Sequence, residues 1–463
     1  MESAVRYLSL TLVLFCVQAF GSPLLLTIRG AEEFVAIFCA GANCSSEKVL
    51  KAQTQEFENG NTFLKLKENV KAQDIRILVP AQLTTNQLFE LLILIRTLKG
   101  EFVTSIDVTS SMRSLSVVDS KGTKILEGEL VYNFLRVAGM DTHNGKYFYT
   151  QLPAKTAYKK TNETIIFAQQ QHQLAQELSA LLGIPVLDRS QRLPMSGRSL
   201  RILQMASNGE NYNEELLKSL IEIHNLKNKK FQVTFLSPYL PYARSDKKDQ
   251  IGVAITGRLV ADLIETAGAD SIVFVRAHAP QSEGFFSIPT LQVSGRKTIN
   301  QFLKSQNVEV VVSPDAGFQK DATLYADELR IPISVVNKQR NLETGESILK
   351  GISGESVVGK KVVIIDDETA SGSTLAKAAE LLKSLGAKSV ICVVTHLAGT
   401  AEKALKSPFI DLVVVTNSLP IKVTSEKLKV LSLAEEISDQ VREIVKTSQS
   451  TSVRSCKAIV SGF

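Results

Sequence analysis

The sequence has no tryptophan, and aromatic residues make up only 6% of its 463 residues. It contains five cysteines, and none of their spacings is that of a zinc site. So few cysteines exclude a disulfide framework as the basis of the fold. The net charge is only +6, and no block of basic residues with interleaved aromatics occurs. Nucleic acid is therefore not expected as a partner.

The two ends of the chain differ in composition from the rest. Arg6 precedes an apolar run at residues 7–20, and residues 19–21 match the small-x-small pattern of a secretory cleavage site. We therefore expect residues 1–30 to be a signal or targeting segment for export or an organelle; the alternative is a hydrophobic extension of a cytoplasmic protein. The run is too short to span a bilayer, so stable membrane insertion is not expected. Residues 447–463, rich in serine and threonine, are expected to form a flexible tail.

The most informative segment is residues 362–374, where four apolar residues lead into Asp366 and Asp367 and then into a hydroxyl-rich turn that opens a helix. An uninterrupted apolar run is typical of a strand buried on both faces of a parallel sheet, and such sheets bind ligands beyond the carboxyl ends of their strands. The turn can present backbone N–H groups and hydroxyls to one anion, and the helix dipole adds positive potential. The aspartates can accept hydrogen bonds from sugar hydroxyls or hold a hard metal ion through water. The pattern predicts a site for a phosphorylated sugar; the alternative is an ordinary loop with exposed acids.

Two stretches of the chain recur at a constant distance. Residues 37–38 recur at 166–167, and six residues between 128 and 141 recur 129 positions later. The six are Gly128, Leu130, Val131, Ala138, Gly139 and Asp141, and they return as Gly257, Leu259, Val260, Ala267, Gly268 and Asp270. Such a spacing favours a tandem duplication of one domain, with copy one at residues 31–160 and copy two at residues 161–290.

The fold class follows from the alternation of elements along the chain. Short apolar runs at residues 271–275, 310–312, 391–394 and 412–415 alternate with amphipathic stretches such as residues 257–267. This alternation predicts an α/β protein in which each domain is a mainly parallel sheet flanked by helices. The carboxyl-terminal domain is expected at residues 291–446.

Segment 362–374 resembles the phosphoribosyl pyrophosphate (PRPP) binding loop of type I phosphoribosyltransferase-like proteins, and further motifs narrow the family. These motifs are Pro241-Tyr242-Ala243-Arg244-Ser245-Asp246-Lys247-Lys248-Asp249, Gly284-Phe285-Phe286, Ser313-Pro314-Asp315-Ala316-Gly317, Asn337-Lys338-Gln339-Arg340 and Val414-Val415-Thr416-Asn417. In their order, from about residue 161 to about residue 446, they resemble the ribose-phosphate pyrophosphokinases, or PRPP synthetases. The resemblance implies tandem phosphoribosyltransferase-like domains and an enzyme of nucleotide biosynthesis, which transfers diphosphate from ATP to ribose 5-phosphate.

The resemblance also implies roles for individual residues. Ribose 5-phosphate would be bound by Asp366, Asp367, Thr369, Ser371, Gly372, Ser373 and Thr374. ATP would be bound by Phe57, Asn59, Arg244, Lys247 and Asp249. His278 and Asp315 would hold magnesium ions, and Lys338 with Arg340 would stabilise the charge of the transition state. Taken one at a time, these residues have simpler explanations: a hydrogen-bonded histidine, a turn aspartate and solvated cations on a strand edge.

Several positions depart from the family pattern. Ser245 stands where a glutamine usually helps to hold adenine. Arg276 replaces an acid two places before His278, which puts positive charge beside a proposed magnesium position. Arg276 either contacts phosphate or marks a weakened site. The other departures are Ala370, Phe318, Gln319 and Asp321.

The two amino-terminal copies retain complementary motifs. Copy one keeps residues 57–59, which resemble the Phe-x-Asn of the adenine-holding loop, but has residues 110–113 where the Tyr-Ala-Arg segment is expected. Copy two keeps Tyr-Ala-Arg and His278 but lacks the other loop. Family members lend this loop across a subunit interface. We therefore hypothesise that copy one serves copy two as a built-in neighbour, so that one composite ATP site forms within the chain or across an oligomer.

Two other functions fit parts of the sequence. A catalytically inactive relative that binds PRPP or nucleotides and regulates a true synthetase would tolerate Ser245 and Arg276, whereas Lys338 and Arg340 favour the enzyme. Phosphoribosyl transfer to a base or amine would use the same loop without the Tyr-Ala-Arg or Lys-x-Arg segments. Besides ATP and ribose 5-phosphate, the expected partners are further copies of the chain or other PRPP synthetase subunits.

Overall fold

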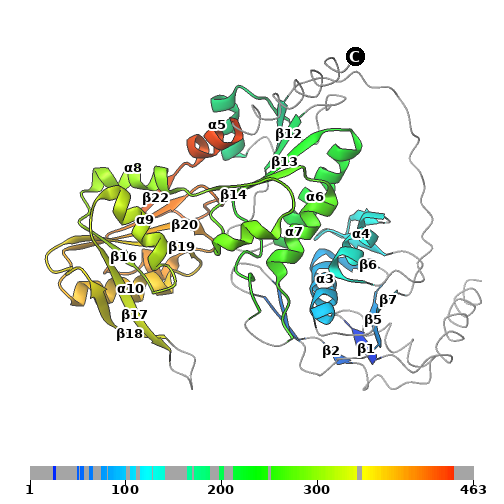
Figure 1. The fold of residues 1–463 in the computed structure, drawn as a ribbon, viewed down its shortest axis with the longest axis horizontal. Helices are drawn as coiled ribbons and strands as arrows, with labels where there is room; N and C mark the ends of the chain where they lie inside the picture. Colours follow the sequence, from blue (N-terminus) through cyan, green and yellow to red (C-terminus); the bar gives the residue numbers. More distant parts are fainter. Residues whose placement is uncertain are drawn as a thin grey trace, which may run out of the picture.

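In the part of the chain that it describes, the computed structural model contains three large sheets that follow one another along the chain, besides a two-stranded and a three-stranded sheet (Figure 1). It describes residues 24–27, 50–51, 53–56, 62–65, 74–80, 82–100, 105–110, 115–127, 129–140, 164–168, 172–187, 198–202, 212–248, 252–340 and 347–442. In these residues no helix is long and apolar enough to cross a membrane. The prediction of an α/β fold with mainly parallel sheets is confirmed.

The third sheet is the largest and carries the predicted sugar-phosphate segment. Its strands are β16 (Val310–Ser313), β17 (Ile333–Arg340), β18 (Ser347–Gly354), β19 (Lys361–Thr369), β20 (Ser389–Leu397), β21 (Leu412–Thr416) and β22 (Leu428–Leu431). Their order is β18-β17-β16-β19-β20-β21-β22, and every neighbouring pair is parallel except β17 with β18. The accompanying helices are α8 (Arg296–Gln306), α9 (Gln319–Leu329), α10 (Ser373–Ser384) and α11 (Glu402–Leu405).

Strand β19 is covered on both faces, as its apolar run predicts. Val362 and Ile364 pack in the core that contains α10, whereas Val363 and Ile365 pack in the opposite core with α8 and α9. This follows from the two-residue period of a strand. The strand is longer than expected, because its pairing with β20 continues through Asp366 to Thr369. The carboxylates therefore lie within the strand, and alternation sends neighbouring acids to opposite faces.

The second sheet supplies the other side of the site. Its strands are β10 (Thr164–Phe167), β11 (Val186–Leu187), β12 (Arg198–Ile202), β13 (Gln232–Ser237), β14 (Ser271–Val275) and β15 (Thr290–Val293), all parallel, in the order β11-β10-β12-β13-β14-β15. Its helices are α5 (Gln173–Leu182), α6 (Tyr212–Asn228), α7 (Thr256–Ala267) and the 3-10 helix η2 (Pro280–Phe285). Since β15 pairs with β14, the expected domain boundary at residue 290 falls at the start of a strand of this sheet.

The first sheet has the order β2-β1-β5-β7, and all of its pairs are parallel. Its strands are β1 (Leu24–Thr27), β2 (Leu50–Lys51), β5 (Asp74–Val79) and β7 (Ser105–Ser110). Beside it are the hairpin β3 (Gln53–Glu56) with β4 (Thr62–Lys65), the small sheet of β6 (Gln82–Thr84), β8 (Ser116–Val118) and β9 (Lys124–Glu127), and the helices α3 (Thr85–Gly100) and α4 (Glu129–Ala138). Strand β1 lies inside residues 1–30, so part of the expected targeting segment belongs to a sheet. The remainder of that segment and the tail at 447–463 lie outside the described residues.

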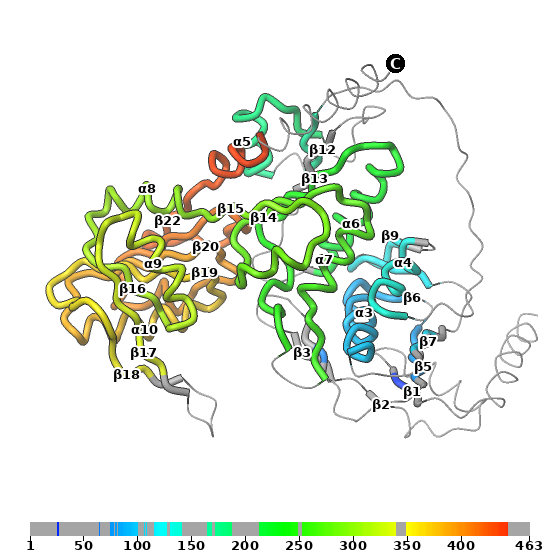
Figure 2. The backbone as a smooth tube through the Cα atoms, in the orientation of Figure 1, coloured from blue at the N-terminus to red at the C-terminus, as the bar shows by residue number. Residues whose placement is uncertain are grey.

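Helices α3 and α4 pack against α6 and α7, and all four share one hydrophobic core (Figure 2). The order β2-β1-β5-β7 of the first sheet corresponds to β11-β10-β12-β13 of the second. Helix α4 ends at Ala138 and α7 ends at Ala267, which keeps the separation of 129. The tandem duplication, with which this correspondence agrees, stays a prediction.

Each of the three large sheets forms a unit with the helices beside it. The end of the described chain connects the third unit to the second. After β22, residues 434–442 return to α5, and Leu433, Ile437 and Val441 pack in one core with residues of α5 and β14 (Figure 1). Asn417 Nδ2 also donates to Glu177 Oε2 at 3.2 Å. These contacts fix the position of the third unit, which contains β19, relative to the second unit, which contains β14.

Candidate active site

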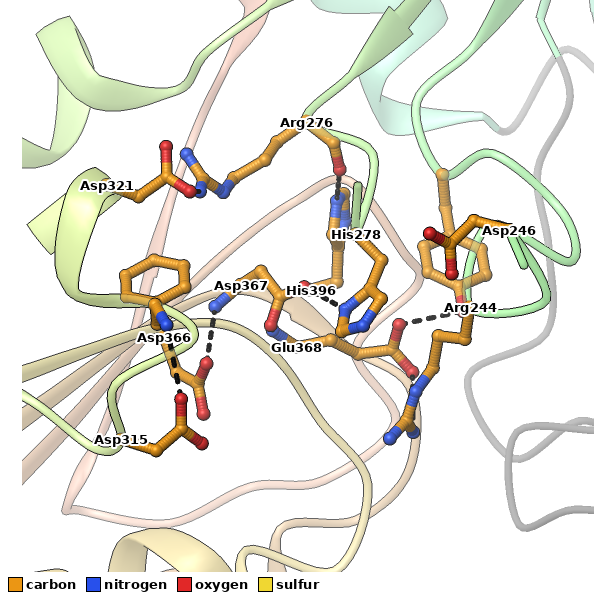
Figure 3. Close-up of polar contacts among 12 residues, drawn as sticks. Arg244, Asp246, Arg276, His278, Asp315, Asp321, Asp366, Asp367, Glu368 and His396 are labelled. Carbon is orange, nitrogen blue, oxygen red and sulfur yellow. Dashed lines mark hydrogen bonds and ion pairs between the residues drawn. The ribbon is translucent and has the colours of Figure 1, made fainter. Parts of the chain in front are cut away.

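Charged residues from the second and third units meet where parallel strands end (Figure 3). His278 follows β14, Asp315 follows β16, and Asp366, Asp367 and Glu368 lie near the carboxyl end of strand β19. The carboxyl edge of a parallel sheet is where open α/β folds bind ligands. The predicted location of the site at this edge agrees with the arrangement of these side chains.

Asp367 is engaged with His278 across the two units. His278 Nδ1 lies 2.6 Å from Asp367 Oδ2, a hydrogen bond between residues 89 positions apart. The N–H of Glu368 donates to Asp367 Oδ1 at 2.8 Å, and the N–H of Asp367 donates to Asp366 Oδ1 at 3.0 Å. Asp367 is thus a buried connector between the units, and Asp366, which points to the other face of β19, is the better placed of the two for a sugar hydroxyl.

The electrostatics of the three acids differ although they are consecutive. Burial, together with the charge of Asp367, raises the pKa of Asp366 well above its ordinary value. Burial works in the same direction on Asp367, but the hydrogen bond and charge of His278 outweigh it and lower the pKa of Asp367. The same hydrogen bond raises the pKa of His278. Negative potential is therefore concentrated at Asp366, where a cation or hydrogen-bond donor is favoured.

Glu368 is a site residue that the sequence reasoning missed. Its side chain is only 5% exposed, and burial raises its pKa. Tyr239 Oη donates to Glu368 Oε2 at 3.0 Å, and Arg244 Nη1 lies 3.8 Å from Glu368 Oε1. The sequence signal that could have identified Glu368 is its position as a third acid directly after Asp366 and Asp367. Glu368 joins the third unit to the Tyr-Ala-Arg turn of the second.

Arg276 is engaged with Asp321 of helix α9. Its buried guanidinium points away from His278, pairs with Asp321 and covers the ring of Phe318 (Figure 3). Its carbonyl accepts a hydrogen bond from His396 Nε2 at 2.8 Å. Asp321 therefore matches the charge of Arg276 in this structure, and the expectation that Arg276 either contacts phosphate or marks a weakened site stays a prediction.

Asp315 has partners of its own. Lys338 Nζ lies 3.1 Å from Asp315 Oδ2, and the N–H of Phe318 donates to Asp315 Oδ1 at 3.1 Å. His278 and Asp315, the expected metal ligands, thus belong to different local networks. Lys338 lies on β17 of the antiparallel pair β17–β18, and its ammonium group pairs with Asp315. It is therefore not a solvated cation on a strand edge.

The anion loop at residues 369–374 is braced by a neighbouring segment. The N–H of Ala401 donates to the carbonyl of Ala370 at 2.7 Å, and the N–H of Lys403 donates to the carbonyl of Ser371 at 2.9 Å. Gly372 is the N-cap of α10 with a φ of 78°, and a Cβ there would lie 2.6 Å from Ala404 Cβ. Only glycine fits this turn without displacing its neighbour. Within the described residues no side chain caps α10, so N–H groups of its first turn are available to an anion.

Other predicted ligands are only partly described. Phe57, Asn59 and Asp249 lie outside the described residues, as does the side chain of Arg340, whose backbone pairs with Ser347. Lys247 is described and exposed. The hypothesis of an adenine-holding loop donated by copy one stays a prediction.

The donor set suits magnesium held jointly with a substrate. Within the described residues no three His, Cys, Asp or Glu side chains gather closely enough to hold a metal ion by themselves. Magnesium, however, is usually bound through one or two carboxylates, waters and substrate phosphates. The raised pKa of Asp366, caused by burial and the adjacent Asp367, marks where a divalent cation would relieve repulsion. Oxygen ligands from Asp366 and Asp315 fit this mode of binding.

Fold and site together define a phosphoribosyltransferase-type α/β protein. A model of the phosphoribosyl transferase domain matches residues 291–430, and a model of the N-terminal domain of ribose phosphate pyrophosphokinase matches residues 36–139 and 193–268. The chain belongs to the ribose-phosphate pyrophosphokinase family.

Named relatives agree with this assignment. The chain is 37% identical over 237 residues to the ribose-phosphate pyrophosphokinase of Wolinella succinogenes, covering 50% of this chain and 76% of the relative. It is 31% identical over 305 residues to ribose-phosphate pyrophosphokinase 2 of Saccharomyces cerevisiae, covering 61% of this chain and 95% of the relative. The crystal structure of phosphoribosylpyrophosphate synthetase from Mycobacterium smegmatis superimposes with a TM-score of 0.54 at 31% identity, over 62% of this chain and 100% of that chain.

Proposed function

We propose that this chain is a ribose-phosphate diphosphokinase, which transfers the diphosphoryl group of ATP to the C1 hydroxyl of ribose 5-phosphate and forms PRPP and AMP. The observation that carries the proposal is the meeting of His278 and Arg244, from the second unit, with Asp367 and Glu368 of β19, directly before an anion loop. The proposed binding sites for a sugar phosphate and for a polyphosphate thereby lie side by side at the carboxyl ends of the strands. The family membership of the chain supports the same reaction.

Ribose 5-phosphate is assigned to the third unit. The 5-phosphate binds the N–H groups and hydroxyls of Thr369, Ser371, Gly372, Ser373 and Thr374 at the start of α10, where the helix dipole favours an anion. Asp366 accepts hydrogen bonds from the ribose hydroxyls. Asp367 holds His278 in place, so its contribution to the sugar is smaller than the sequence suggested.

ATP is assigned to the edge formed by the second unit. Arg244 and Lys247 bind its phosphates, and Phe57, Asn59 and Asp249 are proposed to complete the nucleotide site. Magnesium supplies charge neutralisation on the phosphates when it is bound, with Asp315, Asp366 and His278 as its candidate protein contacts. Lys338 and Arg340 stabilise the negative charge that spreads over the transferred group. Positioning and charge neutralisation are the main sources of rate in such transfers.

AMP formation tests this function. Purified protein incubated with ATP, magnesium and ribose 5-phosphate is expected to release AMP only when the sugar is present. Lys338→Ala is expected to lower kcat by about 100-fold or more with a smaller effect on KM, since the lysine acts on transition-state charge. Lys360→Ala, which removes a surface cation of the same unit, is the matched control. Absence of AMP at every magnesium concentration, with ribose 5-phosphate still bound, would instead identify a regulatory relative.

The organisation of the chain is proposed as two related amino-terminal units at residues 31–160 and 161–290 and one carboxyl-terminal unit at 291–446. We propose that the chain assembles with further copies of itself or with other synthetase subunits. Sedimentation velocity of the purified protein tests this, and a purely monomeric species at micromolar concentration would contradict it.

A further inference from the structure

The turn that carries Arg244 is built against the first unit. Tyr242, two residues before Arg244, is only 1% exposed and lies in the shared core of helices α3, α4, α6 and α7. Its ring stacks on Phe89 of α3, with ring centroids 6.2 Å apart and an angle of 8° between the planes. An aromatic pair at this distance is attractive and directional. A residue of the first unit therefore contacts the Tyr-Ala-Arg segment directly.

A second connection runs through hydrogen bonds. Tyr242 Oη donates to Asn213 Oδ1 at 2.6 Å, and Asn213 Nδ2 donates to Asn86 Oδ1 at 2.9 Å. Asn86 and Phe89 are three residues apart on α3, so they lie on the same face of the helix. One face of α3 thus holds both the ring and, through Asn213, the hydroxyl of Tyr242.

The backbone of Tyr242 needs such support. Its φ is +59°, a left-handed conformation that a bulky side chain rarely adopts. Such strain persists only where surrounding contacts over-determine it. The carbonyl of Tyr242 accepts the N–H of Ser245 at 2.9 Å, which closes the turn around Arg244. The conformation at Tyr242 consequently sets the direction in which the half-exposed Arg244 side chain leaves the turn, toward Glu368.

We propose that Phe89 and Asn86 are positioning residues for Arg244, and that the first unit has been retained because it sets the geometry of the polyphosphate site in the second. The inference rests on the proposed role of Arg244 in binding ATP. It does not require the Phe57–Asn59 loop to reach the nucleotide. The first unit then contributes to the site through Tyr242 even though it contains no Tyr-Ala-Arg segment of its own.

The test compares variants on the same helix interface. Phe89→Leu removes the ring stack, and Asn86→Ala removes the hydrogen bond to Asn213 at a partly exposed position. Arg96→Met is the matched control, because Arg96 lies on the same helix but donates to the carbonyl of Val137 at 3.0 Å and pairs with Asp262 of α7. Binding of a non-hydrolysable ATP analogue and of ribose 5-phosphate is measured separately by calorimetry, together with the melting temperature.

We expect Phe89→Leu and Asn86→Ala to weaken analogue binding about fivefold to tenfold while ribose 5-phosphate affinity stays within about twofold. Arg96→Met lowers the melting temperature without this selective loss. In an Arg244→Ala background the two variants have no further effect on analogue binding, because the group that they position is gone. If Phe89→Leu does not fold, Asn86→Ala carries the same comparison alone.

Each other outcome counts against the proposal. Equal losses for both ligands, an effect of Arg96→Met equal to that of Phe89→Leu, or an undiminished effect in the Arg244→Ala background would reduce α3 to a structural support. Failure of the wild type to bind the analogue overturns the inference as well. If the wild type forms no AMP but the selective losses are found, the positioning role stands and the proposed reaction falls. If AMP is formed but the variants show no selective loss of analogue binding, the proposed reaction stands and the positioning role falls.

Discussion

Arg276 Nη2 lies 2.8 Å from Asp321 Oδ2, and the guanidinium carbon of Arg276 lies 4.9 Å from the centre of the Phe318 ring. The structure places the three residues in one contact between the second unit and helix α9. The charge of Arg276 is thus matched by an acid and an aromatic ring, and the contact bridges the two units beside the site.

The first prediction concerns this bridge. Asp321→Asn leaves the charge of Arg276, which is 6% exposed, without its partner, so we expect a loss of about 3 kcal/mol in the free energy of unfolding. Arg276→Met with Asp321→Asn is expected to cost less than the sum of the single changes, with a coupling of about 1–3 kcal/mol in urea unfolding. The exposed pair Lys406 and Glu402 serves as the control, for which no measurable coupling is expected because solvent screens the two charges. Strict additivity at Arg276 and Asp321 would refute the bridge.

The second prediction concerns the anion loop. Gly372→Ala adds a Cβ at a φ of 78° and within 2.8 Å of the Ala404 N atom, so the start of α10 must shift. We expect ribose 5-phosphate affinity to fall about tenfold or more, measured by calorimetry, because the N–H groups of the loop no longer converge on one anion. Gly359→Ala is the control, since it has a similar φ of 71° with nothing within 4 Å of the added Cβ. Comparable affinity losses in both variants would mean that general strain, and not the loop, is responsible.

The third prediction concerns Glu368. Glu368→Gln preserves the side-chain length and an acceptor for Tyr239 but removes the charge that faces Arg244. Because Arg244 is half-exposed, the lost attraction is small, and we expect KM for ATP to rise about twofold to fivefold with KM for ribose 5-phosphate unchanged. Steady-state kinetics with each substrate varied in turn provides the measurement, with Glu355→Gln on the surface of the same unit as the control. An unchanged KM for ATP would show that Glu368 does not orient Arg244.

The fourth prediction concerns pH. Burial lowers the pKa of His396 to about 4, although the carbonyl of Arg276 accepts its Nε2 hydrogen bond. The unfolded chain, in which the pKa is near 6.5, therefore takes up a proton before the folded protein does. The contribution of His396 to stability is complete above about pH 6.5 and is lost as the pH falls toward 4.

We expect this group to account for roughly 3 kcal/mol of the acid destabilisation. Urea unfolding of the wild type and of His396→Gln at pH 7, 6, 5 and 4.5 checks the expectation, since the curve of the variant should be flatter by this contribution. Parallel curves for the two proteins would mean that His396 does not titrate between the folded and unfolded states.

Much of the third unit could be predicted from the sequence because its signals are local. The apolar residues 362–365 indicated a strand buried on both faces, and the hydroxyl-rich turn after them indicated the helix that begins at Ser373. The order of motifs along the chain identified the family. The end of the strand was misjudged, because only its pairing with β20 shows that Asp366 to Thr369 continue it.

The amino-acid sequence by itself determined the α/β class, the family and the turn that opens α10, since each depends on periodicity or on motifs within a few residues. Only the tertiary structure decided which charges neutralise one another. His278 meets Asp367 across 89 positions, Tyr239 meets Glu368 across 129, and Arg276 turns to Asp321 and away from the site. The physical reason is that the energy of a charge depends on distance and burial, which are set when separate sheets and helices pack together, and which no local pattern encodes.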